Sequence, residues 1–239
     1  TGDGEYKWWE YYKRPQPQLK ELAEIAKRCQ LAEACVFSVS GNTTVKHLSN
    51  SIQNVNILSV SHKYDQIVSF ELEKGRYFTE IESTSGKNLA IIGNNVAIGL
   101  FRNNRAIGKS IKIKGANYKI IGVFKKEGES IIGQSHDNQV ILTVNSVRKL
   151  IAIHKRHIEA RIMVKAKNNV KNSELKENLT GIIRSIRKLK PMAANNFALN
   201  ETSILSNGLD QMFRIINLAG WVIGGFSILV GGFGIANIM

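Results

Sequence analysis

The tripeptide Gly108-Lys109-Ser110 is the part of this sequence that most resembles a reaction site, because it matches the end of a phosphate-binding loop. Such a loop needs a further glycine five places before the first residue of the tripeptide, and Asn103 holds that position. The lysine also begins an alternating run typical of a strand, whereas a phosphate loop leads into a helix. We therefore exclude phosphate binding at this tripeptide.

The histidines lack the neighbours that a metal site or a general base requires. His154 and His157 lie three residues apart in a basic segment, where surface histidines are much commoner than metal ligands. The dipeptide His136-Asp137 lies in a polar, glycine-rich stretch that is typical of a loop. None of these residues predicts a site by its spacing.

The two cysteines, Cys29 and Cys35, form neither a C-x-x-C pair nor a set of metal ligands. A disulfide between them and two free thiols are both compatible with the sequence. No serine lies in a G-x-S-x-G motif, and no base stands near either cysteine in the sequence. We therefore expect no catalytic residues, no cofactor and no metal in this chain.

The most distinctive stretch is the last one, residues 218–239. No charged residue follows Arg214, so the uncharged run covers about 25 residues, enough for a helix to cross a bilayer. Its glycines would weaken a helix in water, but in lipid they let two helices approach closely. Gly220 and Gly224 have the spacing of such a contact, and Gly231 repeats it with Ser227. The run predicts a membrane helix that is cut short, in a piece of a longer protein.

Composition indicates that the residues before this uncharged run form a folded, basic domain. The chain has 239 residues, 43% of them hydrophobic, which is enough for a packed core and excludes a disordered chain. The formal net charge of +14 favours anionic surfaces, but in the absence of a nucleic-acid motif a solvated surface is the better explanation. The charge does not decide on which side of a membrane the domain lies, because the positive-inside rule is weak for domains of this length.

Hydrophobic periodicity predicts the elements that carry these features. Apolar residues at intervals of three and four predict helices at 17–29 and 170–189. Period-two alternation predicts two strands within 34–48, joined by a turn at Gly41-Asn42. The other predicted elements are strands at 55–60, 89–92, 110–115, 118–124, 139–144 and 159–165, helices at 94–101, 146–153 and 201–213, and a loop at 125–138. We expect the helix at 201–213 to continue into the membrane span.

Three stretches, taken together and in order, carry a family resemblance. They are GRYFT at 75–79, NLAIIGNNVAIGLF at 88–101 and AIGKSIKIKGANYKIIGVF at 106–124. They resemble the extracytoplasmic domain of the MacB-like ABC-transporter permeases, the macrolide-exporter type, and residues 195–205 and 218–239 resemble that family's approach to its second membrane helix. The matching structural positions are Gly75, Arg76, Tyr77, Phe78, Gly93, Phe101, Ile107, Gly108, Gly122 and Val123.

The resemblance implies an α+β, two-lobed extracytoplasmic domain followed by a truncated transmembrane helix. A porter-like lobe would comprise residues 1–75 and 139–213, an inserted small α/β lobe residues 76–138, and the membrane helix residues 214–239. Most of the chain would lie on the periplasmic side of a bacterial inner membrane. The implied partners are a cytoplasmic ABC ATPase, a second permease copy or paralogue, membrane lipid and, as further candidates, a periplasmic adaptor and an outer-membrane channel.

The implied function is transmission of ATP-driven motion across the membrane, for export or envelope remodelling. Coupling would pass through residues 201–213 and the helix face of Gly220 and Gly224. A membrane-anchored sensor or interaction domain is the alternative function. A nucleic-acid-binding module is disfavoured, because Lys112 and Lys114 share their strand face with no aromatic partner.

Overall fold

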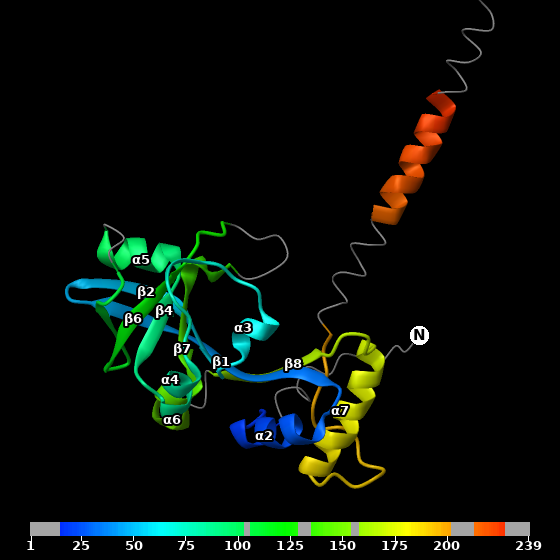
Figure 1. Cartoon of the computed structure of the whole chain (residues 1–239), viewed down its shortest axis with the longest axis horizontal. Helices are drawn as coiled ribbons and strands as arrows, with labels where there is room; N and C mark the ends of the chain where they lie inside the picture. The colour runs from blue at the N-terminus through cyan, green and yellow to red at the C-terminus, as the bar shows by residue number, and fades with distance from the viewer. Residues whose placement is uncertain (1–14, 103–105, 129–134, 154–157, 202–212, 228–239) are drawn as a thin grey trace, which may run out of the picture. The chain divides into compact units, whose positions relative to one another are not determined.

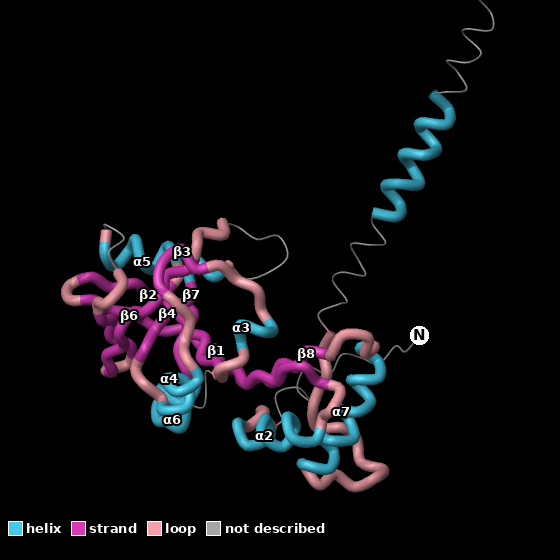
Figure 2. Tube along the Cα trace, viewed as in Figure 1, coloured by secondary structure: helices cyan, strands magenta, loops and turns pink. Residues whose placement is uncertain are grey.

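The computed structural model of the chain describes residues 15–102, 106–128, 135–153, 158–201 and 213–227. The chain divides into two compact units, Thr1–Ala198 and Leu199–Met239. The first unit is built on a mixed, eight-stranded sheet with helices packed against it, as Figure 1 and Figure 2 show. The second unit contains a helix over residues 213–227.

Six strands of the sheet pair in a closed ring. In order around the ring they are β1 (Ala32–His47), β2 (Asn50–Val60), β7 (Gln139–Thr143), β4 (Leu89–Ile92), β6 (Ala116–Phe124) and β5 (Ser110–Ile113), which pairs again with β1. Two further strands pair from outside the ring: β3 (Leu72–Gly75) with β6, and β8 (Glu159–Ala166) with β1. Closure leaves the ring strands without a long open edge that another chain could pair with.

Strand β1 corrects one prediction. The turn expected at Gly41-Asn42 is absent, because β1 continues through both residues and Gly41 pairs with Ile57 of β2. The reversal comes later, at Leu48-Ser49, where His47 pairs with Asn50. Continuous pairing with one partner strand outweighs the local turn signal of a glycine followed by asparagine.

Two apolar clusters lie on opposite faces of the ring strands. One draws on all six ring strands and on helix α5 (Asn94–Phe101), so it fills the ring; Tyr118, Ile120 and Leu142 are fully buried in it. The other lies outside the ring, where helix α3 (Tyr64–Ile67) and the chain up to Phe78 cover residues such as Ile91 and Phe124. Apolar side chains on both faces explain the nearly continuous apolar runs of β4 and β7.

A third packing region joins the two ends of the first unit. Helix α2 (Leu19–Arg28) packs on β1 and on helix α7 (Asn172–Ile186), and β8 pairs with the first half of β1. Helices α4 (Glu80–Ser85) and α6 (Val144–Ile153) lie against each other elsewhere in the unit. The fold is therefore α+β, and N- and C-terminal segments of the first unit pack together. The division into a porter-like lobe and an inserted lobe stays a prediction, as do the boundaries at residues 75–76 and 138–139.

Candidate functional site

The turn after β3 requires glycine by its geometry. Gly75 has a φ of +90°, and a Cβ added there would lie 2.1 Å from the carbonyl oxygen of Ile121 and 2.7 Å from the Cα of Gly122. The backbone N–H of Arg76 donates to the same carbonyl at 3.1 Å. A side chain of Ile107 fills the remaining space, since its Cδ1 would lie 2.9 Å from that Cβ. These motif residues thus form one close backbone crossing.

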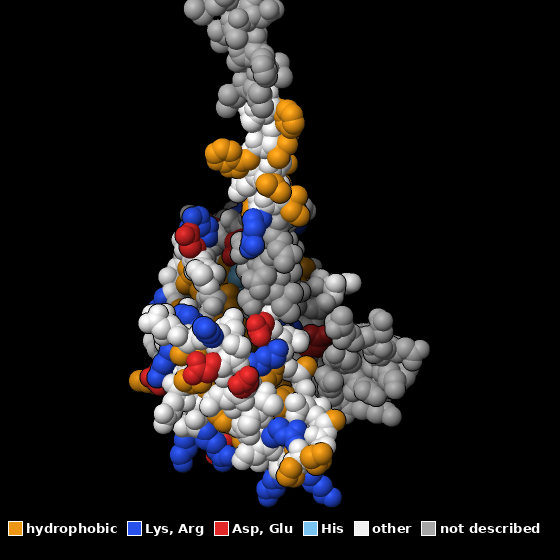
Figure 3. Space-filling model, turned by 90° about the vertical axis from the view of Figure 1, so that its right-hand side faces the viewer, with side chains coloured by type: hydrophobic (Ala, Val, Ile, Leu, Met, Phe, Trp, Pro, Cys, Tyr) orange, Lys and Arg blue, Asp and Glu red, His pale blue; other side chains and the backbone are white. Residues whose placement is uncertain are grey.

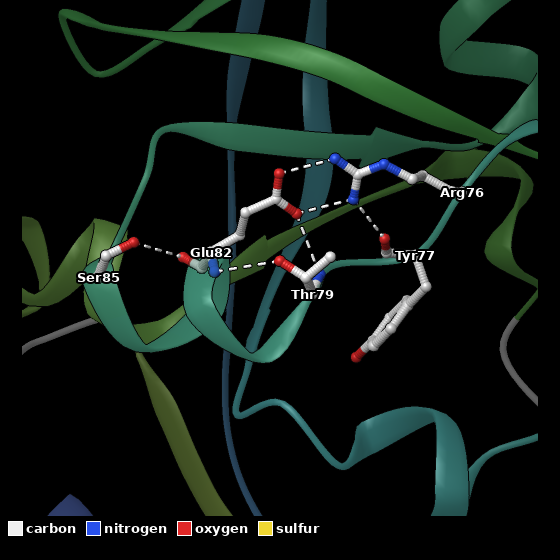
Figure 4. A network of polar contacts seen from close by, with 5 residues as sticks. All are labelled: Arg76, Tyr77, Thr79, Glu82 and Ser85. Carbon is white, nitrogen blue, oxygen red and sulfur yellow. Dashed lines mark hydrogen bonds and ion pairs between the residues drawn. The ribbon is translucent and has the colours of Figure 1, made fainter.

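Arg76 and Glu82 fix the direction in which the chain leaves this crossing (Figure 4). The guanidinium donates to both carboxylate oxygens at 2.7 Å and to the carbonyl of Tyr77 at 3.0 Å. The same carboxylate accepts from the backbone N–H of Thr79 at 3.0 Å, and Thr79 Oγ1 accepts in return from the N–H of Glu82. This reciprocal capping box starts α4.

The electrostatics of the pair favour the ionised carboxylate. The hydrogen bond from Arg76 lowers the pKa of Glu82 to about 2, with the Thr79 bonds acting in the same direction against the effect of burial. The Glu82 side chain is 13% exposed, while that of Arg76 is 53% exposed. Because the carboxylate oxygens are already occupied by donors, the pair anchors the turn and holds no proton available for catalysis.

The aromatic residues of the same motif belong to the core. Phe78 is buried, and its ring lies 5.2 Å from that of Tyr77, which in turn contacts Phe70 at 5.7 Å. Phe70 also meets Phe124 edge to face at 5.3 Å. Burial raises the pKa of the Tyr77 hydroxyl, so this group stays protonated.

Gly93 permits a second close approach. It is the N-cap of α5, and a Cβ added there would lie 2.2 Å from the carbonyl oxygen of Asp137 and 2.3 Å from that of His136. Its N–H donates to the carbonyl of Gln139 at 2.7 Å. The motif glycine therefore seats α5 directly on the start of β7.

The segment predicted as a polar loop, 125–138, contains buried polar residues, among them the His136-Asp137 dipeptide, which the sequence analysis interpreted as part of that loop. A 3-10 turn (His136–Asn138) precedes β7, and His136 and Asp137 are buried. Asp137 accepts from the backbone N–H groups of Glu127 and Gly128 at 3.1 and 3.0 Å. The carboxylate of Glu127 accepts from the N–H of His136 at 2.9 Å and contacts its Nδ1 at 2.9 Å.

These contacts tie together the two ends of the loop. The His136 ring stacks on Phe124 at 4.9 Å, which fixes it against the outer apolar cluster. The signal in the sequence was that two acidic residues, Glu127 and Asp137, stand at the two ends of a glycine-rich stretch. The hydrogen bonds that each accepts from the opposite end depend on burial, which spacing does not reveal. Among the residues described here, no group of three or more His, Cys, Asp or Glu side chains could hold a metal ion.

The remaining motif residues support the ring. Phe101 and Val123 are buried; the Phe101 ring lies 4.3 Å from that of His47, and Lys109 Nζ stands 5.1 Å from its centre. Gly108 has a φ of +84° with open space around it. Ser110 begins strand β5, so the strand predicted after the Gly-Lys-Ser tripeptide is confirmed.

The cysteines are free thiols in this structure. Cys29 is buried, and burial together with the neighbouring Cys29 raises the pKa of Cys35 to about 11. A thiol with so high a pKa is a poor nucleophile at neutral pH. His154 and His157 lie outside the described residues.

The helix over residues 213–227 exposes apolar side chains around its surface, as Figure 3 shows for one side of the molecule. Trp221 is 82% exposed, and space around Gly220 and Gly224 is open. Gly231 and most of the helix predicted at 201–213 fall outside the described residues. Within the described part of the chain, no helix has both the length and the apolar character needed to cross a membrane.

Comparison with known proteins identifies the family. The MacB-like periplasmic core domain family matches residues 6–182. The chain belongs to this family. Macrolide export ATP-binding/permease proteins MacB resemble it: that of Bdellovibrio bacteriovorus is 26% identical over 204 residues, covering 84% of this chain and 31% of the relative, and that of Neisseria meningitidis is 26% identical over 215 residues, covering 90% and 32%. The chain thus spans about a third of the length of these MacB proteins.

Solved structures agree on the fold. The periplasmic region of MacB from Actinobacillus actinomycetemcomitans matches with a TM-score of 0.69 at 14% identity, over 87% of this chain and 89% of that one. The extracellular domain of the ABC-type transporter YknZ from Gram-positive bacteria matches with a TM-score of 0.57 at 18% identity, over 73% and 92%. The α+β arrangement described above is therefore the MacB-like periplasmic fold.

Proposed function

We propose that this chain is the extracytoplasmic part of a MacB-like ABC-transporter permease, and that it transmits ATP-driven motion across the inner membrane. The family match over residues 6–182 carries the proposal. The relatives' shared name joins an ATP-binding part to a permease, and this chain covers 31% of one of them. The remaining length would hold the other membrane helices and the ATPase, in one chain or in a separate subunit.

The helix at 213–227 supports a place beside the membrane. Its large apolar side chains are exposed, among them Leu218 (68%), Trp221 (82%) and Phe226 (66%). Such side chains are costly in water and favourable in lipid. With the uncharged sequence that follows, the helix would form the first part of a membrane span and place the first unit on the outer side.

Motion would reach the first unit through this helix. Nucleotide binding and hydrolysis by a cytoplasmic ATPase would move the helix against a second permease copy or paralogue, with the face of Gly220 and Gly224 in contact. A periplasmic adaptor and an outer-membrane channel are the expected receivers of the motion. The relatives are named for macrolide export; for this chain we propose export or envelope remodelling, with a membrane-anchored sensor as the alternative.

The test uses the full-length transporter that contains this chain, reconstituted in vesicles. Gly220→Leu combined with Gly224→Leu should weaken ATP-dependent export and its link to ATP hydrolysis, because leucine keeps the backbones apart. Val222→Leu, on another side of the same helix, is the matched control and should leave both activities unchanged. Equal export by the glycine variant and the control would refute the assignment of the Gly220 and Gly224 face to the helix contact. Ligand binding by the outer part without any ATP-dependent transport would support the alternative function as a sensor.

A further inference from the structure

Residues 190–197, which lead toward the terminal helix, form no regular helix or strand, yet one arginine holds their backbone. All four Nη hydrogens of Arg184 have acceptors within this segment. Nη1 donates to the carbonyl of Ala193 at 2.8 Å and to Asn195 Oδ1 at 2.6 Å; Nη2 donates to the carbonyls of Lys190 at 2.7 Å and Pro191 at 2.8 Å. A planar guanidinium can serve several acceptors in fixed directions, so this side chain sets the shape of the segment.

Arg187, three residues along the same helix face, extends the attachment to the other end of the first unit. Its Nε and Nη2 donate to the two carboxylate oxygens of Glu21 in α2 at 2.9 and 3.2 Å. Its Nη1 donates to the carbonyl and the side-chain oxygen of Asn196, both at 3.1 Å, and its guanidinium lies 5.8 Å from the ring centre of Phe197. The Arg187 and Glu21 side chains are only 9% and 12% exposed, so water screens this ion pair weakly.

The backbone at the C-terminal end of α7 directs residues 190–197 toward the two arginines. Lys188 adopts a φ of +51°, its N–H donates to the carbonyl of Ser185, and the N–H of Leu189 donates to that of Arg184. This is the Schellman pattern of a helix end, formed here without the usual glycine. It turns the chain back so that residues 190–197 pass beside the helix face that carries Arg184 and Arg187.

We propose that Arg184 and Arg187 form a clamp that makes residues 190–197 a rigid extension of α7 and connects it to α2. The role in transport rests on the function proposed above. A free coil of eight residues would have a root-mean-square span of about 16 Å and ample slack. Switching motions of packed helices are commonly about 1–5 Å, so such slack would absorb them. The clamp removes the slack within residues 190–197, so a displacement that arrives at the end of this segment reaches α7 and α2.

Backbone ¹⁵N relaxation of the 239-residue chain tests the clamp itself. In the unmodified chain, residues 192–197 should have order parameters near those of α7, about 0.85. Arg184→Gln should lower those of residues 192–195, which contain acceptors of Arg184, below about 0.6 while α7 stays ordered. Arg76→Gln, which removes a guanidinium network elsewhere in the unit, is the matched control and should leave them unchanged. Low order parameters in the unmodified chain, or no change in Arg184→Gln, would overturn the clamp.

A second variant separates the two arginines. Glu21→Gln keeps an acceptor for the capping bond to the N–H of Gln18, which is 2.9 Å long in the structure, but loses the ion pair with Arg187. Residues 192–195 should then stay ordered through Arg184, and faster hydrogen exchange should appear in α2. Loss of order over residues 192–195 in Glu21→Gln would contradict the separate roles of the arginines, in which Arg184 holds this segment and Arg187 connects it to α2.

The coupling role is tested in the intact transporter. Arg184→Gln should reduce ATP-dependent export by about threefold or more. Arg184→Lys should behave like Arg184→Gln, because an ammonium group keeps the charge but lacks the planar fork. Full export by a variant whose segment is disordered would overturn the coupling role. If the unmodified transporter shows no ATP-dependent export, the proposed function fails, and the relaxation data still decide on the clamp.

Discussion

Replacement of Glu82 by glutamine breaks the ion pair in the Arg76–Glu82 network while keeping the size of the side chain. Glutamine can still accept from the N–H of Thr79, so the capping box survives. The change removes the negative charge and one of the two guanidinium hydrogen bonds, both 2.7 Å long, because an amide nitrogen cannot accept. The variant therefore measures how much the ionised carboxylate contributes to folding.

The pKa of Glu82 gives the magnitude of the carboxylate's contribution to stability and the direction in which it changes with pH. A decrease from 4.5 to about 2 corresponds to about 3 kcal/mol of preference for the charged form. Because Arg76 is 53% exposed, solvent screening reduces this to about 1.5–2 kcal/mol. The folded-state pKa is the lower one, so the contribution is complete above pH 4.5 and disappears as the pH decreases toward 2.

Urea unfolding at several pH values measures the difference. At pH 7 the unmodified chain should be about 1.5–2 kcal/mol more stable than Glu82→Gln, and this gap should narrow steadily between pH 4.5 and pH 2. Glu80→Gln, in the same first turn of α4 but outside this network, serves as the control and should change stability by less than about 0.5 kcal/mol. A gap between Glu82→Gln and the unmodified chain that stays constant from pH 7 to pH 3 would show that the ion pair does not stabilise the fold.

Three further predictions concern glycine geometry and thiol reactivity. Gly75→Ala should lower the free energy of unfolding in urea by about 3 kcal/mol or more, because strain at positive φ adds to backbone overlap. Gly108→Ala introduces only the strain and should lower it by about 1–2 kcal/mol. Equal losses in the two variants would contradict the close backbone crossing at Gly75. Gly93→Ala should destabilise by about 3 kcal/mol and speed hydrogen exchange at the start of β7, and unchanged exchange would refute the close contact. Alkylation of Cys35 at pH 7, followed by mass spectrometry, should be about a hundredfold slower than that of an ordinary cysteine, because its pKa is raised from 9.0 to about 11; a normal rate would refute its burial.

Elements with strong local signals were predictable from the sequence. The predicted bounds of β4 and α5 agree with the structure, because an apolar run and a glycine N-cap mark them. Elements α4 and β3 were missed although Thr79 and Glu82 carry the capping-box spacing, since four to six residues give little periodicity. Short elements depend on contacts with distant residues for their existence.

Long-range contacts limit how much of the candidate site can be predicted from the sequence. Arg187 and Glu21 are 166 residues apart, and nothing in the sequence near either residue indicates the other. The burial of His136 follows from the rings of Phe124 and Phe70 around it, so a polar sequence was interpreted as a solvated loop. The motif glycines could be recognised as a pattern, but only the structure explains why Gly75 and Gly93 are needed.

The length of β1 limits how this protein can be divided. Its 16 residues extend over about 50 Å, and Ser38, Val39 and Ser40 are paired on both edges, with β2 and with β8. A fragment ending within these residues would leave strands with exposed backbone donors and acceptors, which favours aggregation. Expression trials should therefore keep β1, β2 and β8 together, and tags or fluorescent reporters are better inserted at the Leu48-Ser49 reversal than at Gly41-Asn42.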